Sequence, residues 1–205
     1  RSAGREGRRA LNREPFRAAL AIAATGGGLA ALAQLDARGF VLPWIVLVPW
    51  LLWLDAPLRP ARAFVASVAL TFVFTFGVFG WFARGIADYA GAPAWHGWFA
   101  LALLAPVLQP QIAVWSVMRS VLRLRGLHGA WLALAGACVY VAAEWIAPKL
   151  FADTLGHGLL PFRHLRQAAD LAGAPGLTLA IVLGNEAAAA GLRAAWRRDV
   201  RGAAR

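Results

Sequence analysis

Six apolar stretches separated by short polar segments set the pattern of this chain. Most of them approach the roughly 20 apolar residues that a helix needs to cross the hydrocarbon core of a bilayer. They cover residues 16–35, 40–54, 63–82, 98–118, 129–147 and 171–192. The pattern therefore predicts an all-α fold, a polytopic bundle of about six transmembrane helices.

Two of these stretches leave alternatives open. The stretch 40–54 is short and contains Pro43 and Pro49, so we expect it to be kinked or only partly inserted. The stretch 16–35 follows a basic segment and could be the core of a signal peptide. Because five further apolar stretches follow it, we favour a retained membrane helix.

The composition indicates that most of the chain is surrounded by lipid and not by water. Of the 205 residues, 60% are hydrophobic and only 15% are charged, whereas soluble domains carry about a quarter charged residues. The net charge of +11 comes from arginines that cluster between the apolar stretches. That distribution is typical of orientation signals in membrane proteins, so we expect membrane lipids and no nucleic acid as partners.

The basic residues also predict a topology. Sixteen of the 21 Lys and Arg residues lie in 1–17, 55–62, 119–128 and 193–205, and five lie in the alternate segments. Because basic loops stay inside, the first set is expected in the cytoplasm. This gives a multi-pass membrane protein with both ends cytoplasmic. Its parts are a basic segment (1–15), a transmembrane domain (16–192) and a basic tail (193–205).

Rows of small residues at helical spacing predict close helix contacts, which drive association in lipid. An alternative is that a chain rich in Ala and Gly produces such rows by chance. The rows are Ala19, Ala23, Gly27 and Ala31; Ser67, Thr71 and Thr75; and Gly176, Ala180, Gly184 and Ala188.

Two acidic residues fall inside apolar stretches, and such residues usually face protein or a wet cavity. Glu144 shares a helix face with Tyr140 and Gly136, so we expect it to face the bundle or its outer mouth; the alternative is an interfacial residue satisfied by water. Glu186 lies in the middle of its stretch, two turns from Arg193, which could reach it.

Other candidate chemistry is sparse. Cys138 is the single cysteine and lies within an apolar stretch, so we expect it to pack in the bundle. The four histidines occupy loops without the spacing of metal ligands. We therefore assign no catalytic residue, no metal and no cofactor from the residues alone.

Several segments of the sequence form motifs that can be compared with known families. The first are Trp-Ile-Val-Leu-Val-Pro-Trp-Leu-Leu (44–52), Phe-Gly-Val-Phe-Gly-Trp-Phe (76–82) and Ala-Asp-Tyr-Ala-Gly-Ala-Pro (87–93). Stronger similarity follows in Ala-Ala-Glu-Trp-Ile (142–146), Leu-Gly-His (155–157), Leu-Arg-Gln-Ala-Ala-Asp-Leu-Ala-Gly-Ala-Pro-Gly-Leu-Thr (165–178) and Val-Leu-Gly-Asn-Glu (182–186). In order and spacing these segments resemble apolipoprotein N-acyltransferases, and the block 165–178 is the most specific of them. Phe151-Ala-Asp departs from the Phe-Pro-Trp of many family members.

The resemblance implies an enzyme of the bacterial inner membrane that transfers an acyl chain from a phospholipid to the N-terminal diacylglyceryl-cysteine of an apolipoprotein. Phospholipid and apolipoprotein are then its partners. The family's Glu, Lys and Cys triad belongs to a nitrilase-like domain that would follow Arg205, so residues 1–205 alone are expected to be inactive.

Within this chain, the resemblance and the apolar pattern suggest residues that face lipid or substrate, or that dock the catalytic domain. These candidates are Trp81, Tyr89, Glu144 and His157. An alternative reading is a small membrane transporter in which Glu144 and Glu186 couple ions.

Overall fold

The structure, a computed structural model, describes residues 2–34, 39–148 and 153–203. In these ranges every regular element is a helix, and no strand is present. The elements are α1 (Ser2–Leu32), η2 (Leu42–Trp44), α2 (Val48–Leu54), α3 (Pro60–Ala90), α4 (Ala94–Leu108), α5 (Gln111–Leu124), α6 (Gly129–Ile146), η3 (Leu155–Leu159), α7 (Arg163–Arg166) and α8 (Ala169–Ala203). The predicted all-α bundle is confirmed.

Five helical segments are long and apolar enough to cross a membrane, so the chain is a multi-pass membrane protein. They are Glu14–Leu32, Pro60–Ala90, Ala94–Leu124, Gly129–Ile146 and Ala169–Arg197. The third segment combines α4 and α5, which meet at Gln109 and Pro110, so the predicted stretch 98–118 consists of two helices.

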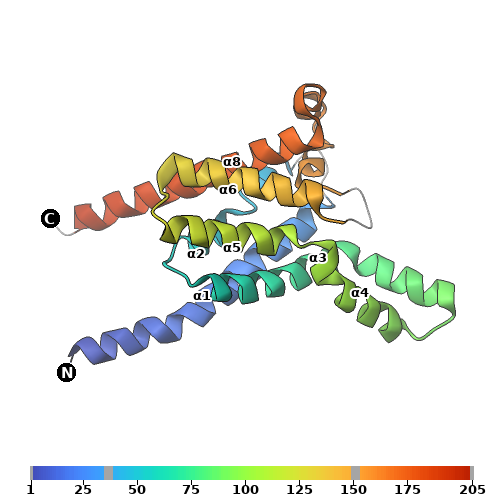
Figure 1. The fold of residues 1–205 in the computed structure, drawn as a ribbon, viewed down its shortest axis with the longest axis horizontal. Coiled ribbons are helices and arrows are strands. Elements are labelled where there is room, and N and C mark those ends of the chain that lie inside the picture. Colours follow the sequence, from blue (N-terminus) through green and yellow to red (C-terminus); the bar gives the residue numbers. More distant parts are fainter. Residues whose placement is uncertain (1, 35–38, 149–152, 204–205) are drawn as a thin grey trace.

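The connections between helices gather at two ends of the bundle (Figure 1). The start of α1, the end of α8 and the α2–α3 and α5–α6 connections lie at one end, which we call the terminal end. The segment with η3 and α7 lies at the opposite end, which we call the distal end. The last turns of α3 project beyond the bundle together with α4 on the distal side. The basic segments 55–62 and 119–128 therefore lie at the opposite end from two of the alternate segments, 83–97 and the described part of 148–170, as the predicted topology requires.

The predicted stretch 40–54 crosses the bundle as an irregular segment, with the turn 45–47 between η2 and α2. Several side chains in and after this turn are buried, among them Val46, Leu47 and Trp50 at 3%, 2% and 0% exposure. Asn185 of α8 accepts a hydrogen bond from Leu47 N–H at 2.7 Å and donates one to Pro43 C=O at 2.7 Å. Non-helical backbone is tolerated at membrane depth where protein surrounds it and satisfies its polar groups. The expected kink is confirmed.

Small residues bring α1, α3 and α4 together. A Cβ atom on Gly26 would lie 2.4 Å from Val73 Cγ1, and one on Gly97 would lie 1.7 Å from the carbonyl oxygen of Ala83. The row Ser67, Thr71 and Thr75 is buried, as predicted. The predicted packing of the row Ala19, Ala23, Gly27 and Ala31 is wrong, because all four are exposed and α1 instead presents Ala21, Thr25 and Gly26 to the bundle.

Candidate functional site

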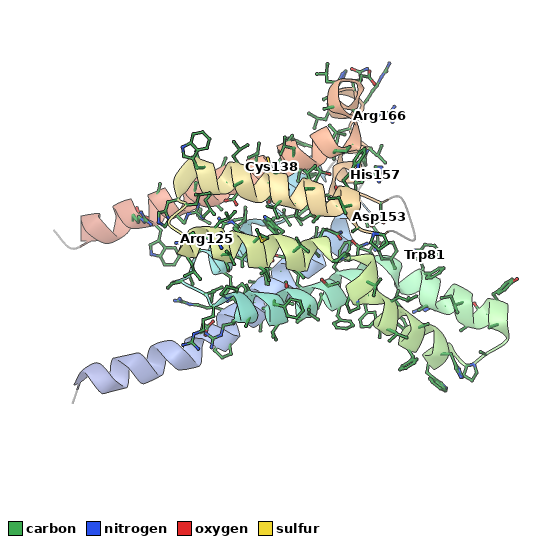
Figure 2. The ribbon with its side chains drawn as sticks, viewed as in Figure 1. Trp81, Arg125, Cys138, Asp153, His157 and Arg166 are labelled. Atoms are coloured by element: carbon green, nitrogen blue, oxygen red, sulfur yellow. The ribbon has the colours of Figure 1, made fainter. Side chains whose placement is uncertain are left out.

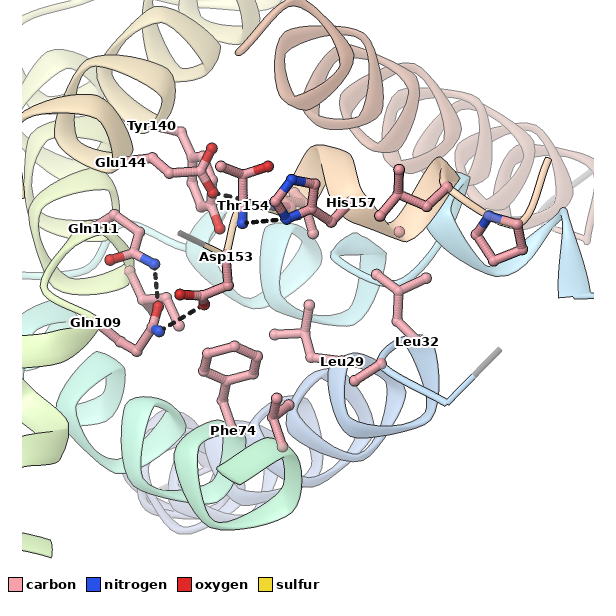
Figure 3. Close-up of a pocket in the computed structure, with 17 residues that line it drawn as sticks. Leu29, Leu32, Phe74, Gln109, Gln111, Tyr140, Glu144, Asp153, Thr154 and His157 are labelled. Atoms are coloured by element: carbon pink, nitrogen blue, oxygen red, sulfur yellow. Dashed lines mark hydrogen bonds between the residues drawn. The ribbon is translucent and has the colours of Figure 1, made fainter. Parts of the chain in front are cut away.

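A cavity of ≈ 360 Å³ opens among the helices at the distal end (Figure 3). Its apolar side is formed mainly by α1 and α3, with Leu29, Leu32, Phe74 and Val78. Its polar side comes from α5, α6 and the segment before and within η3. The polar residues that line it are Gln109, Gln111, Tyr140, Glu144, Asp153, Thr154 and His157. The cavity is therefore amphipathic.

Glu144 connects α6, η3 and α8 beside this cavity. It is 4% exposed. Its Oε1 accepts a hydrogen bond from the Leu155 N–H at 2.8 Å, and its Oε2 accepts one from the Thr178 hydroxyl at 2.8 Å. The Thr178 oxygen in turn accepts a bond from the Gly156 N–H at 2.9 Å. One carboxylate thus fixes the wall of the cavity, as expected for Glu144 facing the bundle.

Gly156 is required by the close approach of η3 to α8. A Cβ atom there would lie 2.5 Å from the carbonyl oxygen of Ala174 and 3.1 Å from the Thr178 nitrogen. Real side chains do not tolerate the first of these distances, so only glycine lets the backbone of η3 reach the Thr178 hydroxyl. The Leu-Gly-His motif therefore has a structural explanation.

A directed chain of hydrogen bonds forms the opposite part of the polar side. The Gln109 side-chain amide donates to Asp153 Oδ2 at 3.0 Å, and the Gln111 amide donates to the Gln109 oxygen. Because a carboxylate only accepts, Asp153 fixes the orientation of both amides. His157 Nδ1 accepts from the Thr154 N–H at 3.2 Å. These bonds tie the start of α5 to the segment leading into η3.

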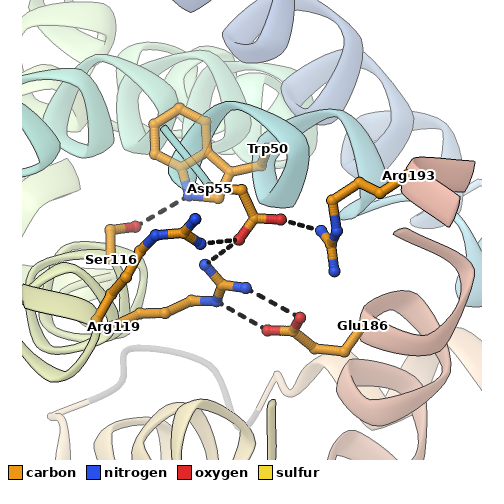
Figure 4. A network of polar contacts seen from close by, with 7 residues as sticks. Trp50, Asp55, Ser116, Arg119, Glu186 and Arg193 are labelled. Atoms are coloured by element: carbon orange, nitrogen blue, oxygen red, sulfur yellow. Dashed lines mark hydrogen bonds and ion pairs between the residues drawn. The ribbon is translucent and has the colours of Figure 1, made fainter. Parts of the chain in front are cut away.

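A second polar cluster lies toward the terminal end and joins α2, α5 and α8 (Figure 4). Arg119 Nε and Nη2 donate to the two carboxylate oxygens of Glu186 at 2.8 and 3.0 Å. Arg119 Nη1 also lies 3.0 Å from Asp55 Oδ1, an ion-pair contact. Asp55 further pairs with Arg123 at 2.7 Å and with Arg193. We call these five residues the Asp55 cluster.

The structure separates the four residues predicted to face lipid, substrate or a catalytic domain. Glu144 and His157 both line the distal cavity. Trp81 and Tyr89 lie on the projecting part of α3 instead and are 63% and 96% exposed. Neither of them lines the distal cavity, and Figure 2 labels Trp81 together with the cavity residues Asp153 and His157.

Two interpretations of single residues are corrected. Glu186 pairs with Arg119, not with Arg193, which binds Asp55. The reason is that α5 continues as a helix beyond Met118, so Arg119 lies inside the bundle at 2% exposure. Cys138 is exposed on α6, so the expectation that it packs in the bundle is wrong (Figure 2).

Sequence reasoning missed Asp55, Arg119, Gln109 and Gln111. For Arg119, Gln109 and Gln111 a signal existed in the polar residues of 109–123, several of which recur at helical spacing. On α5 the buried polar residues are Gln111, Ser116, Arg119 and Ser120. This pattern marks a polar face that turns toward the bundle.

The segments that carry the family resemblance meet in space. Glu144 from 142–146, Gly156 from 155–157 and Thr178 from 165–178 share one hydrogen-bond network. Asn185 from 182–186 forms hydrogen bonds with Leu47 of 44–52 and with Pro43 just before it. Motifs far apart in sequence thus build the distal cavity and the irregular crossing segment.

Comparison with known proteins agrees with this arrangement. Residues 26–187 match the family described as the apolipoprotein N-acyltransferase N-terminal domain. No match was found among curated proteins or among solved structures. The family match spans well over half of the chain and includes all the residues of the distal cavity. The chain therefore belongs to the apolipoprotein N-acyltransferase N-terminal domain family.

Proposed function

We propose that this chain is the membrane part of an enzyme that transfers an acyl chain from a phospholipid to the N-terminal diacylglyceryl-cysteine of apolipoproteins, in the bacterial inner membrane. In this proposal it anchors a nitrilase-like catalytic domain at the distal end and gives lipid substrates access to it. The observation that carries the proposal is the family match over residues 26–187.

The distal cavity supports the part concerning lipid access. Both substrates of the reaction combine acyl chains with a polar group, and the cavity presents apolar residues of α1 and α3 opposite the polar residues of α5, α6 and η3. Pockets with this division hold the apolar part of a ligand by burial and orient it by a few polar contacts. We propose that an acyl chain lies against Leu29, Leu32 and Phe74.

The projecting part of α3 and α4 supports the part concerning anchoring. α3 contains 31 residues, which at the helical rise is about 46 Å and exceeds the roughly 30 Å hydrocarbon core. A tight crossing at Gly97 and Ala83 joins its last turns to α4. We propose that Trp81 and Tyr89 on this hairpin contact lipid headgroups or the catalytic domain.

The transporter alternative loses its main argument. An ion-coupling carboxylate must be able to exchange its partner, whereas Glu186 holds Arg119 through two bonds and Glu144 holds both Leu155 and Thr178. Contacts of this kind favour a structural role for both carboxylates, in which they join neighbouring helices.

The first test is to read the gene downstream of the codon for Arg205. A nitrilase-like coding region there supports the proposal, and a stop codon revives the transporter. The second test expresses the complete gene product in cells depleted of their own apolipoprotein N-acyltransferase. We expect mass spectrometry to find triacylated lipoprotein N-termini. If the product inserts stably and only diacylated lipoproteins accumulate, the proposed function is wrong.

A further inference from the structure

A smaller cavity of ≈ 240 Å³ lies at the terminal end, away from the distal cavity. The α2–α3 connection, the last turns of α5 and the residue before α6 form its walls. Its lining residues are Ala56, Pro57, Leu58, Ser120, Arg123, Leu124 and His128. The proposed acyl transfer gives this cavity no role.

The Asp55 cluster beside this cavity has an unbalanced charge. Three guanidinium groups, those of Arg119, Arg123 and Arg193, share the two carboxylates of Asp55 and Glu186. The cluster therefore carries one positive charge in excess. An excess of like charge is costly in a partly buried setting, so an anion bound next to the cluster would stabilise it.

Arg123 is the member of the Asp55 cluster that an anion in the cavity can contact. The Arg119 side chain is 2% exposed and does not line the cavity, whereas the Arg123 side chain is 30% exposed and does. Only Nη1 of Arg123 is used for the contact with Asp55. Because a guanidinium has five N–H donors, Arg123 can also bind a ligand in the cavity.

A buried hydroxyl in the same wall also lacks a partner. Ser120 is 3% exposed, and its Oγ has no hydrogen-bond partner in the described part of the chain. An unsatisfied buried hydroxyl is unfavourable, and a ligand oxygen would satisfy it. Ser120 lies one turn before Arg123 on α5, so both donors face the cavity from one helix.

We propose that this cavity binds a phosphate group, most favourably the phosphodiester of an anionic phospholipid in the leaflet at the terminal end. The group supplies one negative charge to the cluster and several acceptor oxygens for Arg123, Ser120 and His128. The flanking Arg59 is exposed and adds positive potential around the cavity. Basic pockets between membrane helices bind acidic lipid headgroups for these reasons.

The test measures lipid binding by the chain of residues 1–205 in detergent micelles. Short-chain phosphatidylglycerol, short-chain phosphatidylcholine of the same acyl length and inorganic phosphate are titrated separately. Native mass spectrometry counts bound lipid, and the thermal midpoint reports stability. We expect phosphatidylglycerol to bind and to raise the midpoint, and phosphatidylcholine to bind more weakly. Equal binding and equal stabilisation by the two lipids would overturn the proposal.

Two variants and one matched control test the site. Ser120→Ala keeps every charge, and Arg123→Gln leaves two guanidinium groups for two carboxylates. We expect both to fold with nearly parental stability in the absence of phosphatidylglycerol and to bind that lipid roughly fivefold more weakly. Arg125→Gln removes a neighbouring exposed charge outside the cavity, and we expect it to bind as the parent does.

Equal loss in Arg125→Gln and Arg123→Gln would show general surface attraction and overturn the site, as would parental binding by Ser120→Ala. If Arg123→Gln does not fold, Ser120→Ala decides. The source of the phosphate follows from competition: displacement of phosphatidylglycerol by inorganic phosphate assigns a site for free phosphate, and retention of the lipid assigns a headgroup site. Both results support the phosphate chemistry.

Discussion

Arg119 on α5 and Glu186 on α8 meet through two contacts, Nε–Oε1 at 2.8 Å and Nη2–Oε2 at 3.0 Å, with exposures of 2% and 3%. The two helices are far apart in sequence, so this pair fixes their relative position. Planar two-point pairing is a geometry that arginine allows and lysine does not. The contact is therefore sensitive to the loss of either member.

Replacing Glu186 with Leu should strongly destabilise the bundle. The change leaves a buried guanidinium with Asp55 alone, and removal of one member of a buried pair costs about 3–5 kcal/mol. The double variant Arg119→Leu and Glu186→Leu should be milder, because Asp55 keeps Arg123 and Arg193. Thermal midpoints in detergent measure both, with exposed Arg125→Leu as the control. A Glu186→Leu variant that melts with the parent would contradict this prediction.

Glu144→Gln should be milder than Glu144→Leu. The Gln oxygen can accept from the Leu155 N–H, and its amide can donate to the Thr178 oxygen, which has a second lone pair. Leu offers neither bond and leaves buried donors unsatisfied, at about 1–3 kcal/mol for each. Thermal midpoints measure the loss of stability, and protease cleavage within 153–160 measures the loss of the contact that holds η3. Equal stability of the Leu variant and the parent would mean that water replaces the carboxylate.

Gly156→Ala should destabilise the wall of the distal cavity. Its Cβ atom would lie 2.5 Å from a backbone oxygen of α8, so η3 must move and the Gly156 N–H loses Thr178. Gly27→Ala is the matched control, because nothing lies within 4 Å of a Cβ atom at that exposed position. We expect the control to be neutral or slightly stabilising, by up to about 1 kcal/mol. If both variants melt alike, η3 is not held as closely as the structure shows.

The fold was accessible from the sequence, because apolar stretches of membrane length are a strong signal, and buried Ser67, Thr71 and Thr75 followed from spacing. The exposed row that begins at Ala19 shows the limit of that reasoning. Small residues permit close packing on any face where they occur, but only the partner helix decides which face is used. Gly26 illustrates this, because α1 uses the face on which Val73 of α3 packs against Gly26.

The candidate site was accessible only in part. Glu144 was noticed because an acid inside an apolar stretch is unusual. Arg119 was assigned to a loop, because the apolar stretch ended at Met118 and hydropathy does not show that the helix continues to Leu124. Its partner Asp55 precedes α3 and gave no local signal. Pairing between distant elements depends on the three-dimensional arrangement, which spacing within one helix does not contain.

The last prediction concerns orientation: the terminal end should face the cytoplasm and the distal end the periplasm. The basis is the excess of basic residues in 1–17, 55–62, 119–128 and 193–205. In a Cys138→Ser background, Leu124→Cys places a thiol at an exposed position of the terminal end, and His164→Cys places one at the distal end. Neither change removes an arginine, so the signal that sets the orientation is preserved.

An impermeant maleimide applied to intact cells with permeabilised outer membranes should label His164→Cys and leave Leu124→Cys unmodified. Lysis should then expose both thiols, which controls for burial. Labelling of Leu124→Cys before lysis, with His164→Cys protected, would place the distal cavity in the cytoplasm. A catalytic domain at that end would then be on the wrong side of the membrane for lipoproteins whose N-termini lie outside, so this result would contradict both the orientation and the proposed function.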